Sequence, residues 1–141
     1  MKKINILLVE DNEGDILLTT EAFEECKIVN QLNILRDGKE AIDFFEGLTS
    51  KSTVPDLVLL DINLPKMSGQ EVLVYIKNNE KYRHIPVIML TTSSTEKDIL
   101  TSYRNNVNCY ITKPVDALEF VKAISKIQDF WICIVTMPKG K

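Results

Sequence analysis

Acidic side chains directly follow an apolar segment at two places in this sequence, a pattern that predicts a polar site at the ends of buried strands. Residues 56–65 read DLVLLDINLP, so Asp61 ends a run of four apolar residues, and Glu10 and Asp11 follow the apolar segment 4–9 in the same way. A short apolar run between turn signals is typical of a strand buried on both faces. Because a carboxylate is costly to bury without a partner, the position of Asp61 suggests a function. The structural alternative is that Asp61 caps the next turn.

The elements that must position these acids are five predicted strands that alternate with five predicted helices. We expect strands at 4–9, 32–35, 57–61, 86–90 and 108–112, and helices at 14–26, 39–48, from 68 or 69, at 95–103 and from about 116. This alternation predicts an α/β fold, a doubly wound five-stranded parallel sheet flanked by five helices. Right-handed crossovers would bring all five carboxyl ends of the strands to one edge.

Ligands of open parallel sheets bind beyond that edge. The predicted strands deliver three acids, one hydroxyl and one ammonium there: Glu10, Asp11, Asp61, Thr91 and Lys113. Two like charges about 4 Å apart cost on the order of 4 kcal/mol at intermediate dielectric, so the acids need positive charge. Lys113 offsets one charge, and an all-oxygen ligand set suits Mg²⁺ for the rest, with the backbone carbonyl of Asn63 as a further ligand. The alternative is a structural cluster in which Lys113 pairs with one acid.

With Mg²⁺ bound, Asp61 is placed as a nucleophile toward a phosphoryl group, since carboxylates form acyl phosphates. The metal and Lys113 would neutralise charge on the transferred group, and Thr91 would hydrogen-bond one of its oxygens. Tyr110 could then rotate into the space that Thr91 vacates; alternatively it is an ordinary edge aromatic with its hydroxyl in water. The bond between Lys113 and Pro114 is a candidate for a cis peptide.

Composition and charge fit one soluble domain and disfavour several classes of function. The chain has 141 residues, 45% of them hydrophobic, and a formal net charge of −3. Nucleic-acid binding depends mainly on phosphate neutralisation and is therefore not expected. No apolar stretch reaches the length of a membrane span and the N-terminus lacks a signal-peptide pattern, so we expect a cytoplasmic protein without a membrane partner. The single histidine, His84, argues against a multi-histidine metal site.

The motif set resembles the receiver domain of two-component response regulators over roughly residues 4–128. The match rests on Glu10-Asp11, Asp61 within LLDINLP, Thr91 and Lys113-Pro114, in that order. The resemblance implies the flavodoxin-like receiver fold, with Asp61 as phosphoacceptor, Glu10, Asp11 and the Asn63 carbonyl around Mg²⁺, Lys113 on the phosphoryl group, and Thr91 with Tyr110 as switch pair. It also implies a phosphohistidine donor on a sensor histidine kinase, and phosphotransfer to its own Asp with slow self-dephosphorylation rather than a separate enzyme activity.

A narrower resemblance joins the chain to the small stand-alone regulators paired with bacterial and cyanobacterial phytochrome kinases, some of which are dimers. It rests on residues 108–113 and on the tail from Phe130-Trp131 to Pro138. We therefore expect residues 1–141 to form a single receiver domain in which 129–141 is an apolar extension of the last helix. An apolar end predicts an interface, so Phe130 and Trp131, extended by Tyr103 and Tyr110, are a candidate homodimer surface. The alternative is that the tail packs on its own domain.

Three other functions fit the sequence less well. A Mg²⁺-dependent phosphatase with an aspartyl-phosphate intermediate needs an acid two residues after the nucleophile, where this chain has Asn63. A flavin or nucleotide binder needs a glycine-rich phosphate loop after the first strand, where residues 9–13 are acidic. A receiver that acts only as a scaffold is disfavoured by the complete acid set. The favoured reading is a phosphorylated receiver that signals to a separate downstream protein through the surface from the fourth strand to the fifth helix.

Overall fold

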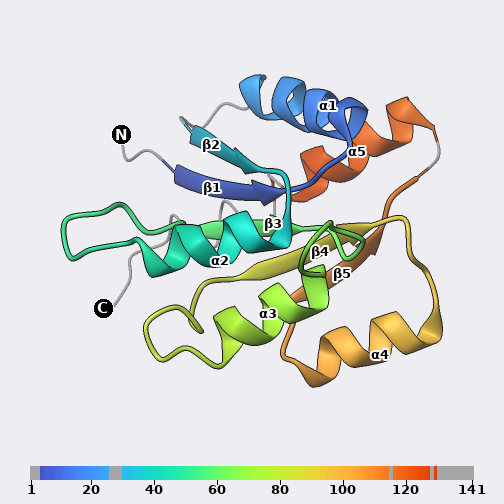
Figure 1. Ribbon diagram of the computed structural model, residues 1–141. Helices are drawn as coiled ribbons and strands as arrows, with labels where there is room; N and C mark the ends of the chain where they lie inside the picture. Colours follow the sequence, from blue (N-terminus) through green and yellow to red (C-terminus); the bar gives the residue numbers. More distant parts are fainter. Residues whose placement is uncertain (1–3, 26–29, 115, 128, 130–141) are drawn as a thin grey trace.

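The computed structural model describes residues 4–25, 30–114, 116–127 and 129, and these form one parallel sheet covered by helices on both faces (Figure 1). The strands are β1 (Ile4–Val9), β2 (Asn30–Leu35), β3 (Leu57–Leu60), β4 (Val87–Thr91) and β5 (Cys109–Thr112). The helices are α1 (Glu13–Glu24), α2 (Gly38–Glu46), α3 (Gly69–Lys77), α4 (Glu96–Arg104) and α5 (Ala117–Ile127). The strand order β2-β1-β3-β4-β5, all parallel, confirms the doubly wound fold that the sequence predicts.

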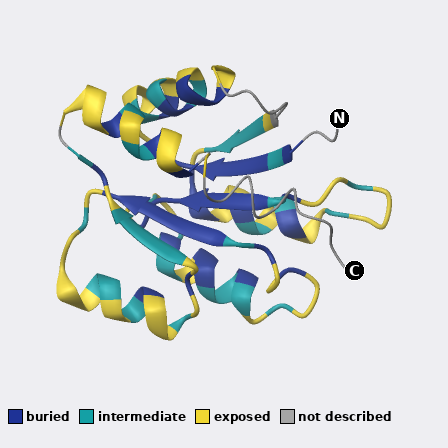
Figure 2. Ribbon diagram, turned by 180° about the vertical axis from the view of Figure 1, so that it is seen from behind, coloured by how far each residue is buried: buried dark blue, intermediate teal, exposed yellow. Residues whose placement is uncertain are grey.

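Two apolar cores lie on opposite faces of the sheet. α1 and α5 cover one face, while α2, α3 and α4 cover the other (Figure 1). Along β3, Leu57 and Leu59 pack in the first core and Val58 and Leu60 in the second, as side chains of a strand alternate between its faces. The central strands are therefore buried on both sides (Figure 2), which explains why they read as continuous apolar runs.

Four helices begin where a polar side chain accepts a hydrogen bond from the first turn. Asn12, Asp37, Ser68 and Thr95 cap α1 to α4, and Ser68 forms a full capping box with Glu71. Such caps satisfy backbone N–H groups that have no partner within the helix. They account for helix starts within one residue of the predicted positions.

One glycine sets how closely α3 approaches the end of β3. A Cβ atom on Gly69 would lie only 1.9 Å from the carbonyl oxygen of Asp61. The N–H of Gly69 also donates to the carbonyl of Ile62 at 2.8 Å. The absence of a side chain at residue 69 therefore lets α3 brace the backbone that carries Asp61.

α4 is attached differently from the other helices, by polar contacts. Ser102 is its one buried residue, while Leu100 and Tyr103 are 49% and 50% exposed. The side chain of Gln70 on α3 donates to the carbonyl of Asp98 at 3.1 Å and to the Ser102 hydroxyl at 2.9 Å. The sequence of this helix has few large apolar residues, and the helix is accordingly exposed over most of its surface and held by polar contacts to α3.

Within the ranges described, no helix combines the length and the apolar character that crossing a membrane requires. The extension predicted for 129–141 lies outside the described residues, except for Asp129.

Candidate functional site

Backbone hydrogen bonds continue the sheet pattern one residue past the strands, and these bonds fix the rim on which the site is built. The N–H of Asp61 donates to the carbonyl of Val9 at 3.1 Å, and the N–H of Lys113 donates to the carbonyl of Thr91 at 2.7 Å. The N–H of Glu10 donates in the same way to the last residue of β2 at 2.9 Å. Glu10, Asp61 and Lys113 therefore all lie at the carboxyl edge of the sheet, with β4 between the strands that carry Asp61 and Lys113.

Three carboxylates converge at this rim. Glu10, Asp11 and Asp61 each offer an oxygen, and the three atoms lie within 4.8 Å of one another. Glu10 and Asp61 are buried, at 3% and 7% exposure, while Asp11 is open to solvent. Carboxylate oxygens alone, with one side left to water, suit a hard cation such as Mg²⁺ or Mn²⁺. The residues present therefore fit a divalent metal.

The ammonium of Lys113 is the positive charge inside this cluster. Its Nζ lies 2.5 Å from Glu10 Oε1, 2.8 Å from Asp15 Oδ2 and 3.3 Å from Asp61 Oδ2. Burial alone would lower the pKa of Lys113, but the hydrogen bonds that its ammonium donates to Asp15 and Glu10 outweigh burial and raise it. Lys113 thus remains an ammonium at neutral pH, and it holds one oxygen of Asp61 while the other accepts the N–H of Ile62 at 2.7 Å.

The carboxyl group of Glu10 binds a proton more tightly than an ordinary glutamate does. Its burial, with a contribution from the charge of Asp61, raises the pKa of Glu10 to about 7. The hydrogen bond from Lys113 works against this shift, but one ammonium is shared among three carboxylates and cannot compensate fully. A proton and a divalent metal would therefore compete for Glu10 near neutral pH.

Asp15 is a site residue that the sequence analysis missed. From the sequence, Asp15 is only a negative charge near the start of the helix predicted at 14–26, but in the structure it contacts Lys113 at the centre of the cluster. A signal was present, because Asp15, Thr19 and Ala22 are spaced i, i+4, i+7 along α1 and the last two are buried. That spacing places the Asp15 side chain on the inward side of α1, one turn from the rim.

Thr91 and Tyr110 meet at the loop that follows β4. Thr91 is fully buried, and its Oγ1 accepts the N–H of Ser93 at 3.3 Å. The hydroxyl of Tyr110 donates to the carbonyl of Ser93 at 2.7 Å, and burial raises the pKa of Tyr110. The alternative in which this hydroxyl lies in water is therefore wrong for this structure, while the switch role of the two residues stays a prediction.

The remaining predictions concern Asn63, the peptide bond before Pro114 and the residues of the candidate dimer surface. Asn63 is exposed in the connection between β3 and α3, where its carbonyl remains a predicted metal ligand. The expectation of a cis bond before Pro114 is wrong, because no described peptide bond is cis. Tyr103 is half exposed on α4, and Phe130 and Trp131 lie outside the described residues.

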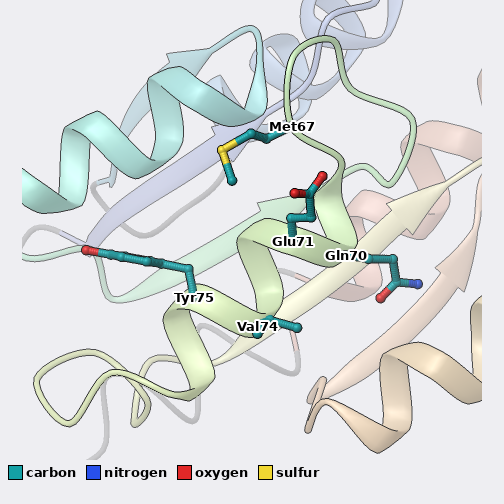
Figure 3. A pocket seen from close by; sticks show the side chains of 5 residues that line it. All are labelled: Met67, Gln70, Glu71, Val74 and Tyr75. Atoms are coloured by element: carbon teal, nitrogen blue, oxygen red, sulfur yellow. The ribbon is translucent and has the colours of Figure 1, made fainter.

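A separate hollow of about 380 Å³ lies along α3 (Figure 3). It is lined by Met67, Gln70, Glu71, Val74 and Tyr75. Its one carboxylate, Glu71, accepts the N–H of Ser68 at 3.1 Å in the capping box. The hollow therefore lacks a free charged group, and the acid cluster remains the candidate site.

Comparison with known proteins agrees with this geometry. The family model of the response regulator receiver domain matches residues 6–125. Response regulator Rcp1 of Synechocystis sp. is 44% identical over 135 residues, which are 94% of this chain and 92% of Rcp1. The probable methanogenesis regulatory protein FilR2 of Methanothrix harundinacea is 41% identical over 130 residues, 90% of this chain and 83% of FilR2.

Two solved structures are also similar over nearly the whole chain. The Mn²⁺-bound form of Rcp1 superposes with a TM-score of 0.90 at 43% identity and covers 96% of this chain and 99% of that one. The phosphorylated cyanobacterial phytochrome response regulator RcpA has a TM-score of 0.91 at 39% identity and covers 98% of this chain and 100% of that one. One relative thus binds a divalent metal and another carries a phosphoryl group.

Proposed function

This chain belongs to the response regulator receiver family, and we propose that it accepts a phosphoryl group on Asp61 from a sensor histidine kinase. One observation carries the proposal: Asp61 shares a rim with two acids suited to a metal and lies 3.3 Å from the ammonium of Lys113. This is the set of charges that phosphoryl transfer to a carboxylate requires. The phosphorylated relative RcpA supports the same reading.

In the proposed step a carboxylate oxygen of Asp61 forms a bond to phosphorus. The bond from phosphorus to the donor breaks, either P–N of phosphohistidine or P–O of acetyl phosphate, and its electron pair leaves with the donor. Lys113 would pair with a phosphoryl oxygen and the Thr91 hydroxyl would donate to another. Stabilising charge on the transferred group is the main catalytic requirement of such a reaction.

Glu10, Asp11 and Asp61 would hold Mg²⁺, with the backbone carbonyl of Asn63 as a fourth protein oxygen. When bound, the metal would neutralise charge shared by Asp61 and the phosphoryl oxygens. The Mn²⁺-bound form of Rcp1 supports a divalent metal at the corresponding acids. The buried Glu10 and Asp61 would fix the inner side of the ion, and the exposed Asp11 its outer side.

The output would be a change on the surface from β4 to α5. A phosphoryl group on Asp61 would draw the Thr91 hydroxyl toward it, and Tyr110, which contacts the same loop through Ser93, would shift in response. A separate downstream protein would read this surface.

We also propose a homodimer surface formed by Tyr103, Tyr110, Phe130 and Trp131. The half-exposed Tyr103 and the apolar sequence of the tail support it. Trp131→Ala is expected to weaken self-association in sedimentation velocity, and an unchanged sedimentation profile would count against this surface.

The kinase is proposed to be a phytochrome, because RcpA is a phytochrome response regulator. The comparable identity to FilR2 makes a different kinase class the alternative. A phosphotransfer screen with purified kinases would separate the two.

Phosphoryl uptake provides the test of the proposed function. With Mg²⁺ and acetyl phosphate, wild-type protein should gain one phosphoryl group by intact mass spectrometry, and Asp61→Asn should gain none because an amide oxygen is a poor nucleophile. The matched control is Asp43→Asn, which alters an exposed aspartate of α2 that pairs with Lys39. Uptake by Asp61→Asn at the wild-type level would reject the assignment.

A further inference from the structure

The contact between Asp15 and Lys113 has no place in the proposed chemistry described so far. Asp15 Oδ2 lies 2.8 Å from Lys113 Nζ, although 98 residues separate them in sequence. We propose that Asp15 is a positioning residue that holds the Lys113 ammonium beside Asp61 while the phosphoryl group is transferred. This inference rests on the proposed function and adds a residue to it.

Lys113 needs such a partner because its other two partners change roles. A lysine ammonium has three donors on a flexible four-carbon stem, and here carboxylates of Glu10, Asp15 and Asp61 take all three. Glu10 and Asp61 belong to the cluster that fits a metal, and among the described residues that cluster does not include Asp15. When the metal and the phosphoryl group engage Glu10 and Asp61, Asp15 would remain as the protein anion that holds Lys113.

Asp15 is itself rigidly placed. Its N–H donates to Asn12 Oδ1 at 2.9 Å, and its carbonyl accepts the hydroxyl of Thr19 at 2.7 Å. Thr19 is 1% exposed, and the Asp15 side chain is 23% exposed. A carboxylate fixed on the first turn of a helix is a preorganised support, so it can hold the lysine without ordering a loop.

Glu13 offers a matched comparison on the same turn of α1. It is also an acid near the helix N-terminus, where both residues interact favourably with the helix dipole. Its side chain is 70% exposed and pairs with Arg36 at 2.7 Å. If these acids only stabilised the helix, substitutions of Glu13 and Asp15 would have similar effects on phosphoryl uptake. If Asp15 acts through Lys113, only the Asp15 substitutions would slow it.

The experiment measures the rate constant of phosphoryl uptake at saturating Mg²⁺ and acetyl phosphate. Removing a charge-stabilising donor outright slows such reactions by about 10²–10³-fold. We expect Asp15→Asn to lower this constant by about tenfold, because it would loosen the position of Lys113 without removing its charge. Asp15→Ala should be at least as slow, since alanine also removes the acceptor that asparagine retains. Glu13→Gln should stay within about twofold of wild type, and Asp15→Glu should recover part of the rate.

A double-mutant cycle then tests whether Asp15 acts through Lys113. In a Lys113→Ala background, Asp15→Asn should cause no further loss. Wild-type uptake rates in both Asp15→Asn and Asp15→Ala would overturn the inference, as would an undiminished Asp15→Asn effect in the Lys113→Ala background. Those results would leave the proposed function intact as long as wild type takes up phosphate and Asp61→Asn does not. Failure of wild type to take up phosphate would reject both.

Discussion

At the scale of single residues, Lys113 faces three carboxylates in this structure, and a phosphorylated Asp61 would require it to face a phosphoryl oxygen as well. The Nζ atom of Lys113 lies 2.5 Å from a carboxylate oxygen of Glu10 and 3.3 Å from one of Asp61. Its positive charge is therefore shared unequally between these two acids. A buried charge cluster of this kind is costly unless every acid has a partner. We therefore expect the free energy of unfolding of the protein to be lower without a bound metal than with one.

The raised pKa of Glu10 turns that expectation into a pH dependence. The pKa of Glu10 is about 7 in the folded protein against an ordinary value of 4.5, so between these values the folded state binds more protons than the unfolded state. The free energy of unfolding contributed by Glu10 must then fall as pH rises from about 4.5 through about 7, by on the order of 3 kcal/mol.

The measurement is denaturant unfolding in EDTA across this pH range for wild type and Glu10→Gln. The free energy difference, wild type minus variant, should fall with rising pH, and added Mg²⁺ should reduce that fall by binding the carboxylate form. A difference that stays constant from pH 5 to pH 8 in EDTA would contradict the assignment.

Sequence predicted most of the site at this scale because its main residues directly follow apolar strands. Glu10, Asp61 and Lys113 could be placed on one rim from chain order and the handedness of crossovers alone. Asp15 could not be placed as readily, since its role depends on the rotation of α1 about its own axis. The hydrogen bond from Tyr110 to Ser93 depends likewise on the path of a loop, which no periodicity predicts.

At the scale of elements, α4 stands apart because its attachment is polar. Gln70 and Ser102 join α3 to α4, and the hydroxyl of Ser93 donates to the Asp98 side chain. Among the described residues, Gln70 Oε1 is the one buried side-chain oxygen or nitrogen without a hydrogen-bond partner. An element held by a few hydrogen bonds can shift without opening an apolar core, as the proposed switch surface requires.

This attachment predicts a local effect of Gln70→Ala. Losing the two hydrogen bonds from Gln70 to α4 should make local opening of that helix easier by about 1 kcal/mol. Hydrogen exchange followed by mass spectrometry should show faster exchange in peptides of α4 and unchanged exchange in α1 and α5. Gln31→Ala, at an exposed position on the edge strand β2, is the control. Equal exchange in α4 for Gln70→Ala and wild type would show that other contacts hold the helix.

Sequence predicted the elements well where periodicity and caps agree. The predicted strand 4–9 matches β1 at both ends, and Ser68 and Thr95 cap α3 and α4 where a helix was expected. The predicted helix 39–48 instead runs as Gly38–Glu46, because apolar Leu48 packs beside the core after the helix has ended at Gly47. Apolar periodicity reports burial, so a partly buried apolar residue just past the end of a helix lengthens the predicted helix.

At the scale of the whole molecule, the fold explains why residues from distant parts of the chain act together. β1 and β3 are neighbours at the centre of the sheet, and β5 reaches them through β4. Right-handed crossovers put all their carboxyl ends on one edge, so three segments about 50 residues apart supply the acids and the lysine. A structural change caused by phosphorylation of Asp61 would therefore begin at this edge and reach the surface through β4, β5 and α4.

The most direct test of the central claim is to locate the phosphoryl group itself. Protein treated with Mg²⁺ and acetyl phosphate can be reduced with borohydride, which converts an aspartyl phosphate to homoserine, and the modified residue can be mapped by tandem mass spectrometry. We predict homoserine at position 61 alone, and none when EDTA replaces Mg²⁺. Modification at Glu10, Asp11 or Asp15 in place of Asp61, or none with the metal present, would contradict the account.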